Sequence, residues 1–231
     1  MKQVVFANAG YYLSGFILLA VLGFWPSYFS QLLDPTVSFN FYFHFHAVIA
    51  LVWILTVIIQ PILIKRGQYK RHRQIGKLSY LIFGLVFISV LLLIHDRHTI
   101  DQENLAGNVF IPFKDLIILA IAYPIAIYFK NNVAIHSRAM IATGLVFVEP
   151  ALVRLIMNVF DRPEAGYLWT IAIVYTIFLT LIVMERKQTS GRWVFPTILF
   201  VYIIVHSVII FRLPLSGFDS FCKWFLSLPL T

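Results

Sequence analysis

The sequence predicts an all-α, polytopic integral membrane protein, with seven transmembrane helices in a single domain, residues 1–231. Three observations predict this class. Of the 231 residues, 60% are hydrophobic and only 12% are charged, whereas a soluble domain is usually about 25% charged. The apolar residues gather in seven stretches, each near the ~20 residues that cross a bilayer. The basic residues gather between alternate stretches.

This composition excludes an ordinary soluble enzyme, a disordered chain and a nucleic-acid-binding module. In a polar protein, a net charge of +8 would suggest DNA binding. In so apolar a chain it fits the rule that cytoplasmic loops of membrane proteins are rich in Lys and Arg. We therefore expect the lipid bilayer as a partner and no nucleic acid.

The apolar stretches follow one another without a linker rich in glycine or serine. The first is long and aromatic, and Phe24-Trp25-Pro26 is not a small-residue cleavage site, so we expect a retained helix. Prolines within later stretches predict kinks, above all at Pro150 beside Glu149. The predicted spans are 9–24, 43–64, 77–94, 112–129, 136–160, 167–184 and 193–211.

The charges predict the orientation. The segments after the second, fourth and sixth spans are basic and contain one acid, Glu185. They should face the cytoplasm, which places the N-terminus inside and the C-terminus outside. We expect the 65–77 segment to contact anionic lipids and the 214–231 tail to lie on the outer membrane surface. The basic residues concerned are Lys65, Arg66, Lys70, Arg71, Arg73, Lys77, Lys130, Arg138, Arg186, Lys187 and Arg192.

Ionisable side chains inside the predicted spans are the strongest functional candidates, because each costs at least about 2.5–3.5 kcal/mol at the bilayer centre. At 1.5 Å per residue, Asp115, Glu149 and His206 lie about 20 Å above the basic end of their helices. His46 lies about 30 Å above it. Four helices thus bring costly polar groups to the outer half of the membrane.

Histidines also occur at the basic end, where His72 lies in the segment that enters the third span and His136 begins the fifth. Two pairs, one per leaflet, would suit two b-type haems stacked across the membrane, since neutral imidazoles from facing helices are natural axial ligands. The first hypothesis is therefore a transmembrane electron carrier with a redox partner. Its ligand pairs would be His46 with His206 outside and His72 with His136 inside. Candidate partners for the haem propionates are Arg66, Arg73 and Arg138.

A second hypothesis is a metal-dependent membrane enzyme. Zinc accepts histidine nitrogen and carboxylate oxygen, and a metal-bound water beside a carboxylate base can hydrolyse or desaturate a lipid. The sequence has no HExxH or HxxxH motif. The candidate ligands for zinc or iron in the outer leaflet are His46, Asp115, Glu149 and His206, with His95 and His98 at the end of the third span.

A third hypothesis is a protein without catalysis or electron transfer. The intramembrane ions would pair with one another and specify helix packing in a scaffold or assembly factor, with another membrane protein as partner. Glu149 and Arg154 are five residues apart, about 140° around one helix, so they are poor partners for each other. The expected partners are His206 or Lys114 for Glu149, and Asp115 or Asp96 for Arg154.

Three segments together resemble a bacterial family of predicted multi-helix membrane proteins known only as a domain of unknown function. They are His46-Ala47 through Gln60-Pro61, then His72-Arg73-Gln74-Ile75-Gly76-Lys77-Leu78-Ser79-Tyr80, then His136-Ser137-Arg138-Ala139-Met140-Ile141 followed by Arg154. The resemblance covers roughly the second to fifth spans. It implies the multi-helix architecture and a multi-pass protein of the bacterial inner membrane, without an activity.

A second similarity is to the cytochrome b561 group. That group also has a histidine leading an apolar helix with Trp and a Pro before a basic end, as in His46, Trp53, Pro61 and Lys65-Arg66. The start of the third span, His72 to Gly76, is similar as well. This likeness implies His46, His72 and His136 as haem ligands. The sequence departs from the group in helix number and in histidine spacing, with His206 on the last helix.

Overall fold

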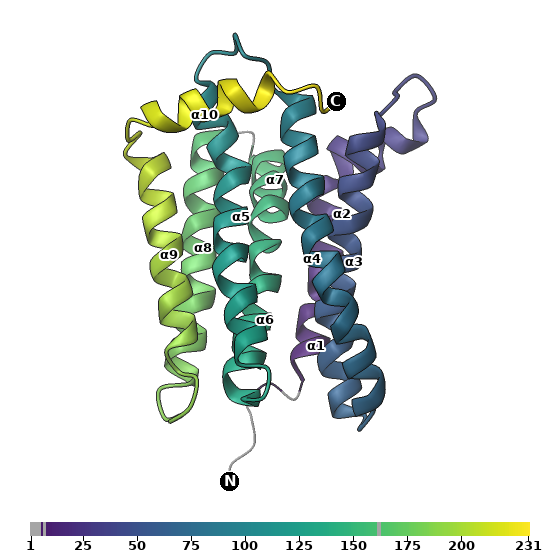
Figure 1. Ribbon diagram of the computed structural model, residues 1–231, viewed down its shortest axis with the longest axis vertical. Helices are drawn as coiled ribbons and strands as arrows, with labels where there is room; N and C mark the ends of the chain where they lie inside the picture. The colour runs from purple at the N-terminus through teal and green to yellow at the C-terminus, as the bar shows by residue number, and fades with distance from the viewer. Residues whose placement is uncertain (1–5, 7, 161–162) are drawn as a thin grey trace.

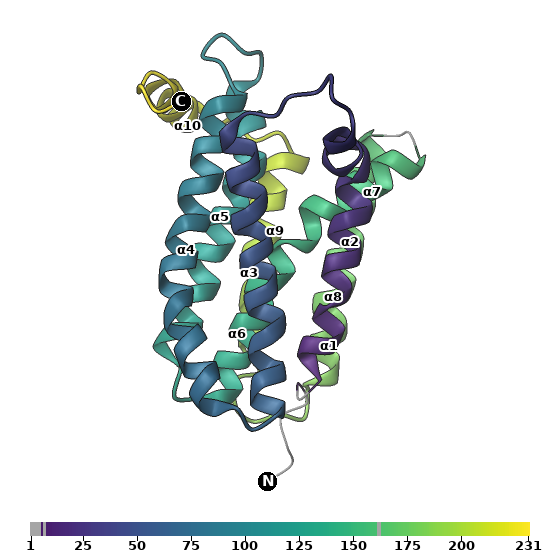
Figure 2. The ribbon, with the colours of Figure 1, turned by 90° about the vertical axis from the view of Figure 1, so that its right-hand side faces the viewer.

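The computed structural model describes residues 6, 8–160 and 163–231. Within these residues the regular structure is helical and contains no strand, which confirms the all-α class. Most helices run side by side along the long axis of the molecule, and the last one lies across one end (Figures 1 and 2). The first described residues and the C-terminus lie at opposite ends of this bundle.

Six helices or helix pairs are long and apolar enough to cross a membrane. The seventh predicted span is a shorter apolar helix, α9, Val194–Ile210. Its 17 residues distinguish it from the other six, which have 20 to 29. The six are Ala9–Phe29 (α1 Ala9–Leu13, α2 Gly15–Phe24 and a π-helical turn, η1 Trp25–Phe29), α3 Phe41–Lys65, α4 Tyr69–Arg97, α5 Leu105–Tyr128, Val133–Phe160 (α6 Val133–Val146 and α7 Val148–Phe160) and Ala165–Met184 within α8 Pro163–Met184.

Helix ends follow local sequence signals. The side chain of Asn40 accepts a hydrogen bond from the Phe43 amide at the start of α3, and Asn132 caps α6 in the same way, as short polar residues do at N-caps. Between α3 and α4 the chain reverses at Gly67, whose φ of +69° suits a residue without a Cβ. These tight connections make antiparallel neighbours of consecutive helices.

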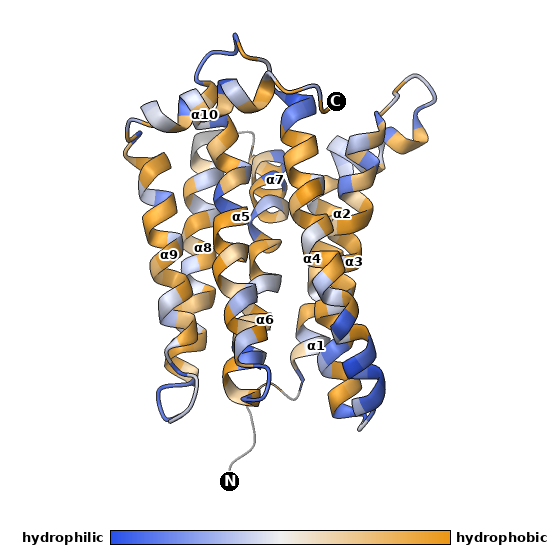
Figure 3. Ribbon diagram, viewed as in Figure 1, coloured by the Kyte–Doolittle hydropathy of each residue, from blue (hydrophilic) through white to orange (hydrophobic). Residues whose placement is uncertain are grey.

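The basic 65–77 segment is not the loop that the sequence analysis expected. Helix α4 begins at Tyr69, so Lys70, Arg71, Arg73 and Lys77 lie on helical turns. Lys, Arg and Gln are good helix formers, and a helix can continue beyond the apolar span into water. Figure 3 shows the hydrophilic residues concentrated at this end of α3 and α4, and hydrophobic residues along the rest of the bundle.

The predicted kink beside Glu149 is confirmed. The span divides at Phe147, whose amide bonds to the Gly144 carbonyl in a tighter turn than an α-helix. Three residues later Pro150 has no N–H to donate to the preceding turn. The chain changes direction here (Figure 2), so that α6 packs against α5 and α9 while α7 packs against α2 and α8.

The surface and the interior are both apolar. Trp53, Phe178 and Tyr202 are fully buried, whereas Leu18, Leu81 and Phe200 are among many large apolar side chains that are exposed. Such extensive apolar exposure on the sides of a bundle is what lipid contact requires. The described part of the chain is thus a helical bundle with several membrane-capable helices.

The tail forms an amphipathic helix, α10, Ser216–Leu226, which lies across the end of the bundle opposite the α3–α4 turn (Figure 1). Its Phe218 packs edge-on against Phe110 of α5, with ring centres 5.7 Å apart. Beyond it, the His95 ring contacts the Leu228 carbonyl oxygen at 2.7 Å and the Thr231 hydroxyl at 2.6 Å. These contacts fasten the tail to α4 and α5.

Candidate functional site

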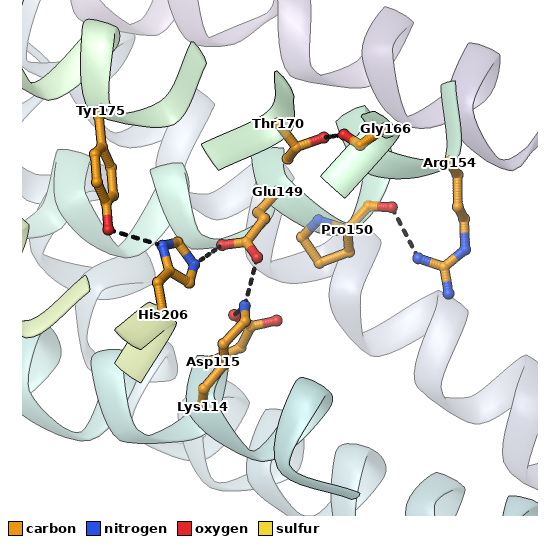
Figure 4. Close-up of polar contacts among 9 residues, drawn as sticks. All are labelled: Lys114, Asp115, Glu149, Pro150, Arg154, Gly166, Thr170, Tyr175 and His206. Carbon is orange, nitrogen blue, oxygen red and sulfur yellow. Dashed lines mark hydrogen bonds and ion pairs between the residues drawn. The ribbon is translucent and has the colours of Figure 1, made fainter. Parts of the chain in front are cut away.

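Two clusters of polar side chains lie within the bundle. The first, which we name the buried ion network, lies in the half of the bundle nearer α10 and consists of Lys114, Asp115, Glu149, Tyr175 and His206 (Figure 4). The second, which we name the histidine pair, consists of His72 and His136 near the α3–α4 turn. The first takes side chains from four helices, the second from two.

The buried ion network is a continuous chain of contacts. Lys114 Nζ lies 2.7 Å from Asp115 Oδ1 and 2.6 Å from Glu149 Oε1. Glu149 Oε2 lies 3.1 Å from His206 Nε2, and His206 Nδ1 lies 3.2 Å from the Tyr175 hydroxyl. Because Glu149 accepts the Nε2 hydrogen, a neutral His206 can accept the Tyr175 proton at Nδ1. The chain joins α5, α7, α9 and α8 (Figure 4).

Burial makes these contacts necessary. Only 1% of Lys114, 3% of Glu149 and 0% of His206 is exposed. Removing such charges from water costs several kcal/mol per ion, and close pairing offsets this only while every partner is present. The expected partners of Glu149 are confirmed, since it contacts both Lys114 and His206.

Arg154 does not pair as the sequence analysis expected. Its Nη1 donates to the Pro150 carbonyl at 2.8 Å, one turn back on α7 (Figure 4). Its guanidinium lies over the Phe24 ring, 4.5 Å from the ring centre. Among the described residues no ion pair joins it to Asp115 or Asp96, because Asp115 is bound by Lys114 and Asp96 lies beside Arg97.

The histidine pair brings two predicted ligands together. The ring centres of His72, on the first turn of α4, and His136, on the first turn of α6, lie 6.5 Å apart, with ring planes at 89°. Imidazole nitrogens bind metals at about 2.0–2.1 Å, so two imidazoles on opposite sides of one metal have ring centres about 6 Å apart. The observed separation fits such a pair.

A hydrogen bond orients one member of this pair, His136, as a ligand. His136 Nδ1 lies 2.8 Å from the Ala126 carbonyl oxygen of α5, so it carries a hydrogen and leaves the Nε2 lone pair available. Metal-binding histidines are oriented in this way by a second partner. In the part of the chain that the structure describes, His72 Nδ1 and both amide atoms of Gln60 are buried with no hydrogen-bond partner. Buried polar atoms normally have hydrogen-bond partners, so these atoms of His72 and Gln60 are available to contact a bound polar group.

The predicted outer haem pair does not form. His46 lies on α3, which packs against α1, α4 and α6, whereas His206 lies on α9, which packs against α5, α6 and α8. The Ser89 hydroxyl donates to the Val86 carbonyl and therefore accepts from His46 Nδ1 at 3.2 Å. His206 is bound to Glu149 and Tyr175 instead. The sequence placed both residues in the outer half of the membrane but contained no information on which helices are neighbours.

The six proposed ligands of an outer metal site also do not converge. Across residues 6, 8–160 and 163–231, no three His, Cys, Asp or Glu side chains are placed to hold one metal ion. His95 binds the tail, and His98 Nδ1 lies 2.9 Å from the Ile94 carbonyl on its own helix. Asp115 and Glu149 are joined through Lys114 rather than through a shared open position.

Of the three arginines proposed as partners of haem propionates, Arg138 has another role. It is buried, forms an ion pair with Glu185 at the end of α8, and donates to the Ala134 carbonyl at 2.5 Å. It therefore fastens α6 to α8. Arg73 is exposed on α4, one residue beyond His72, and keeps its predicted place near the histidine pair.

Sequence reasoning missed Tyr175, Gln60 and Glu185. A signal existed for Gln60 and Glu185, because each is a polar residue within or directly after an apolar stretch. Tyr175 carried none, since tyrosine is common in membrane helices. Comparisons with protein-family models, with curated proteins and with solved structures found no match to this chain. Its class therefore rests on its own fold and its two polar clusters.

Proposed function

We propose that this protein is a haem-binding electron-transfer protein of the membrane, with haem b held between His72 and His136. One observation carries the proposal, namely the 6.5 Å separation of the two imidazole rings, with His136 held in the ligand tautomer by the Ala126 carbonyl. Haem b, when bound, supplies one-electron transfer. His72 and His136 would hold one such group, because they offer imidazole nitrogens from two separate helices.

The surrounding residues would each have a defined task. The Ala126 carbonyl fixes the His136 ring and raises the basicity of its Nε2. The amide of Gln60, which has no hydrogen-bond partner, can donate a hydrogen bond to a carboxylate through its nitrogen or accept one through its oxygen. Arg73 can neutralise a propionate at the membrane surface. We propose a single haem at this end, since His46 and His206 lie on helices that do not pack together.

The proposed topology has seven spans, with the N-terminus and the histidine pair on the cytoplasmic side of a bacterial inner membrane. Its support is the run of basic residues from Lys65 to Lys77, which belongs to the hydrophilic end of α3 and α4 (Figure 3), and the placement of the first described residues and the C-terminus at opposite ends of the bundle (Figure 1). With 17 residues, α9 is at the lower limit of about 17–25 residues for a spanning helix. Labelling of single introduced cysteines from either side of the membrane tests this orientation.

The experiment for the haem is a visible absorption spectrum of the detergent-purified full chain, first oxidised and then reduced with dithionite, with metal analysis of the same sample. We expect a Soret band that sharpens and shifts on reduction. His72→Ala and His136→Ala should each abolish it. His98→Ala, at the other end of the same helix as His72, is the matched control and should keep it.

The proposal fails if the protein stays colourless after reconstitution with haem. It also fails if both variants keep the wild-type spectrum. Stoichiometric zinc or iron without haem, lost in the same two variants, would assign the histidine pair to a metal ion instead.

A second candidate function is a non-enzymatic scaffold or assembly factor. The observation that favours it is the closure of the buried ion network, in which Lys114 binds both acids and Glu149 also binds His206. This candidate predicts a colourless and metal-free protein. Its test is limited proteolysis at the α6–α7 junction, which should become faster in Lys114→Met and stay unchanged in His72→Ala.

A further inference from the structure

A cavity of about 400 Å³ opens at the end of the bundle away from the histidine pair. We name it the arginine pocket. It lies among α2, the η1 turn, η2 Gln31–Leu33, α3, α4 and α7. Its lining residues are Phe24, Ser27, Gln31, Phe39, Phe43, Leu93, Arg97 and Arg154. Two arginines from separate helices thus face one cavity whose other walls are mostly aromatic.

The pocket has more positive than negative charge. None of its lining residues, all of which lie in the described part of the chain, is acidic. Arg97 Nε is 3.9 Å from Asp96 Oδ2, and the Arg97 side chain is 52% exposed. Asp96 also accepts a hydrogen bond from the Asn40 amide. Asp115 of the buried ion network attracts Arg154 electrostatically, but its ion pair among the described residues is with Lys114, so Arg154 has no acid in direct contact.

Both guanidinium groups lie over aromatic rings. The Arg97 guanidinium carbon lies 4.7 Å from the centre of the Phe43 ring, and that of Arg154 lies 4.5 Å from the centre of the Phe24 ring. Stacking stabilises the cation and fixes the plane of its N–H fork. Arg154 uses one N–H for the Pro150 carbonyl. The remaining donors are available at the edges of the two groups.

An arginine within a membrane-capable helix is costly without a counter-charge, and this pocket does not itself provide one for Arg154. Two arginine forks offer more N–H donors than one carboxylate can accept, whereas a phosphate group has enough oxygens for both. The rings of Phe24, Phe39 and Phe43 give the same cavity an apolar wall. A ligand that satisfies both features is anionic at one end and apolar at the other.

We propose that the arginine pocket binds the phosphate group of an amphiphile, with Arg97 and Arg154 on the phosphate oxygens and the apolar part against the phenylalanine rings. The site is independent of the proposed haem, because it lies at the opposite end of the bundle and uses none of the same residues. A phospholipid and free inorganic phosphate share this headgroup chemistry, and the experiment separates them.

The experiment titrates the detergent-purified full chain with three probes, namely short-chain phosphatidylglycerol, the matching diacylglycerol that lacks the phosphate, and inorganic phosphate. Binding is followed by calorimetry, and folding of every variant is checked by circular dichroism. We expect saturable binding of phosphatidylglycerol and none of diacylglycerol. Arg154→Gln and Arg97→Gln should each weaken phosphatidylglycerol at least about 10-fold, as loss of a charge-assisted contact does.

Two further variants sharpen the result. Arg212→Gln removes an exposed arginine at the same end of the bundle but outside the pocket, and it should bind like the wild type. Arg154→Lys keeps the charge but loses the flat fork, so it should bind between the wild type and Arg154→Gln. If Arg154→Gln does not fold, the half-exposed Arg97 still gives the test.

Inorganic phosphate could bind as tightly as phosphatidylglycerol, with the same dependence on the two arginines. That result would overturn the proposal that the ligand is an amphiphile and would identify a site for the free anion. Equal binding of diacylglycerol would overturn the role of the phosphate. Wild-type affinity in both Arg97→Gln and Arg154→Gln would overturn the assignment of the pocket.

Discussion

Replacing Lys114 with methionine tests whether the buried ion network holds the bundle together. Methionine keeps a long flexible apolar side chain and removes the ammonium that contacts Asp115 Oδ1 at 2.7 Å and Glu149 Oε1 at 2.6 Å. Glu149 then retains only His206, at 3.1 Å. Asp115 loses the only ion-pair partner that the described residues give it, and Glu149 is left with the imidazole alone.

The magnitude follows from the burial of the two partners. Removing one member of a buried ion pair costs about 3–5 kcal/mol, because the other charge stays in place without compensation. The Glu149 side chain is 4% exposed and cannot reach water, whereas that of Asp115 is 18% exposed and can do so in part. We therefore expect the free energy of unfolding to fall by about 3 kcal/mol, the lower end of this range. Adding Glu149→Gln should restore part of it, with a coupling of about 0.5–3 kcal/mol.

The assay is reversible unfolding of the full chain in mixed micelles by increasing SDS, followed by circular dichroism. The matched control is Lys223→Met, which removes a lysine from a surface ion pair with Asp219 on α10 and should have no measurable effect. A Lys114→Met variant as stable as Lys223→Met would refute the reasoning. So would a double variant whose loss equals the sum of the two single losses.

Three further outcomes are expected. Gly23→Ala should lower the free energy of unfolding by about 1–3 kcal/mol, because a Cβ there would overlap the Ala151 backbone. The control Gly84→Ala places its Cβ in open space and should leave the stability unchanged. Equal unfolding midpoints for the two variants would contradict this prediction. Arg138→Gln should cost about 3 kcal/mol or more by leaving Glu185 buried alone, and the exposed Arg186→Gln is its control. Burial, together with the nearby Asp219 carboxylate, raises the pKa of the Cys222 thiol to about 11. Maleimide at pH 8 should therefore label Cys222 only after the protein unfolds. Fast labelling of the folded chain would contradict this prediction.

The helical class and the membrane-capable stretches could be predicted because hydrophobicity alone determines them. All seven predicted stretches are helical, and the break near Pro150 was visible as a missing backbone donor. The helical state of the 69–77 segment was not predicted, because basic composition indicates orientation but does not distinguish a loop from a helix that extends into water. Helix propensity of Lys and Arg was the available signal.

The candidate site was predicted in part. The sequence places Glu149 and His206 at similar depth, and the structure joins them. It places His46 in the same outer half of the membrane, but His46 binds Ser89. Depth follows from residue counting along each helix, whereas lateral neighbours follow from packing of small residues and kinks, which a single sequence does not display. The same limit explains why Arg138 was assigned to a cofactor rather than to Glu185.

The contact between α2 and α7 has a consequence for the order of assembly. The first span is held at one end by α3, where Gly10 lies against the Ile58 carbonyl, and at the other end by α7, where Gly23 lies against Ala151. The ribosome delivers α3 directly after the first span but delivers α7 only after α4, α5 and α6. The α1 end can therefore dock early, while the α2 end must wait in the lipid until most of the protein has been inserted. The α2–α7 contact at Gly23 thus forms late in biogenesis, and until then this surface would be accessible to a membrane chaperone or quality-control protease.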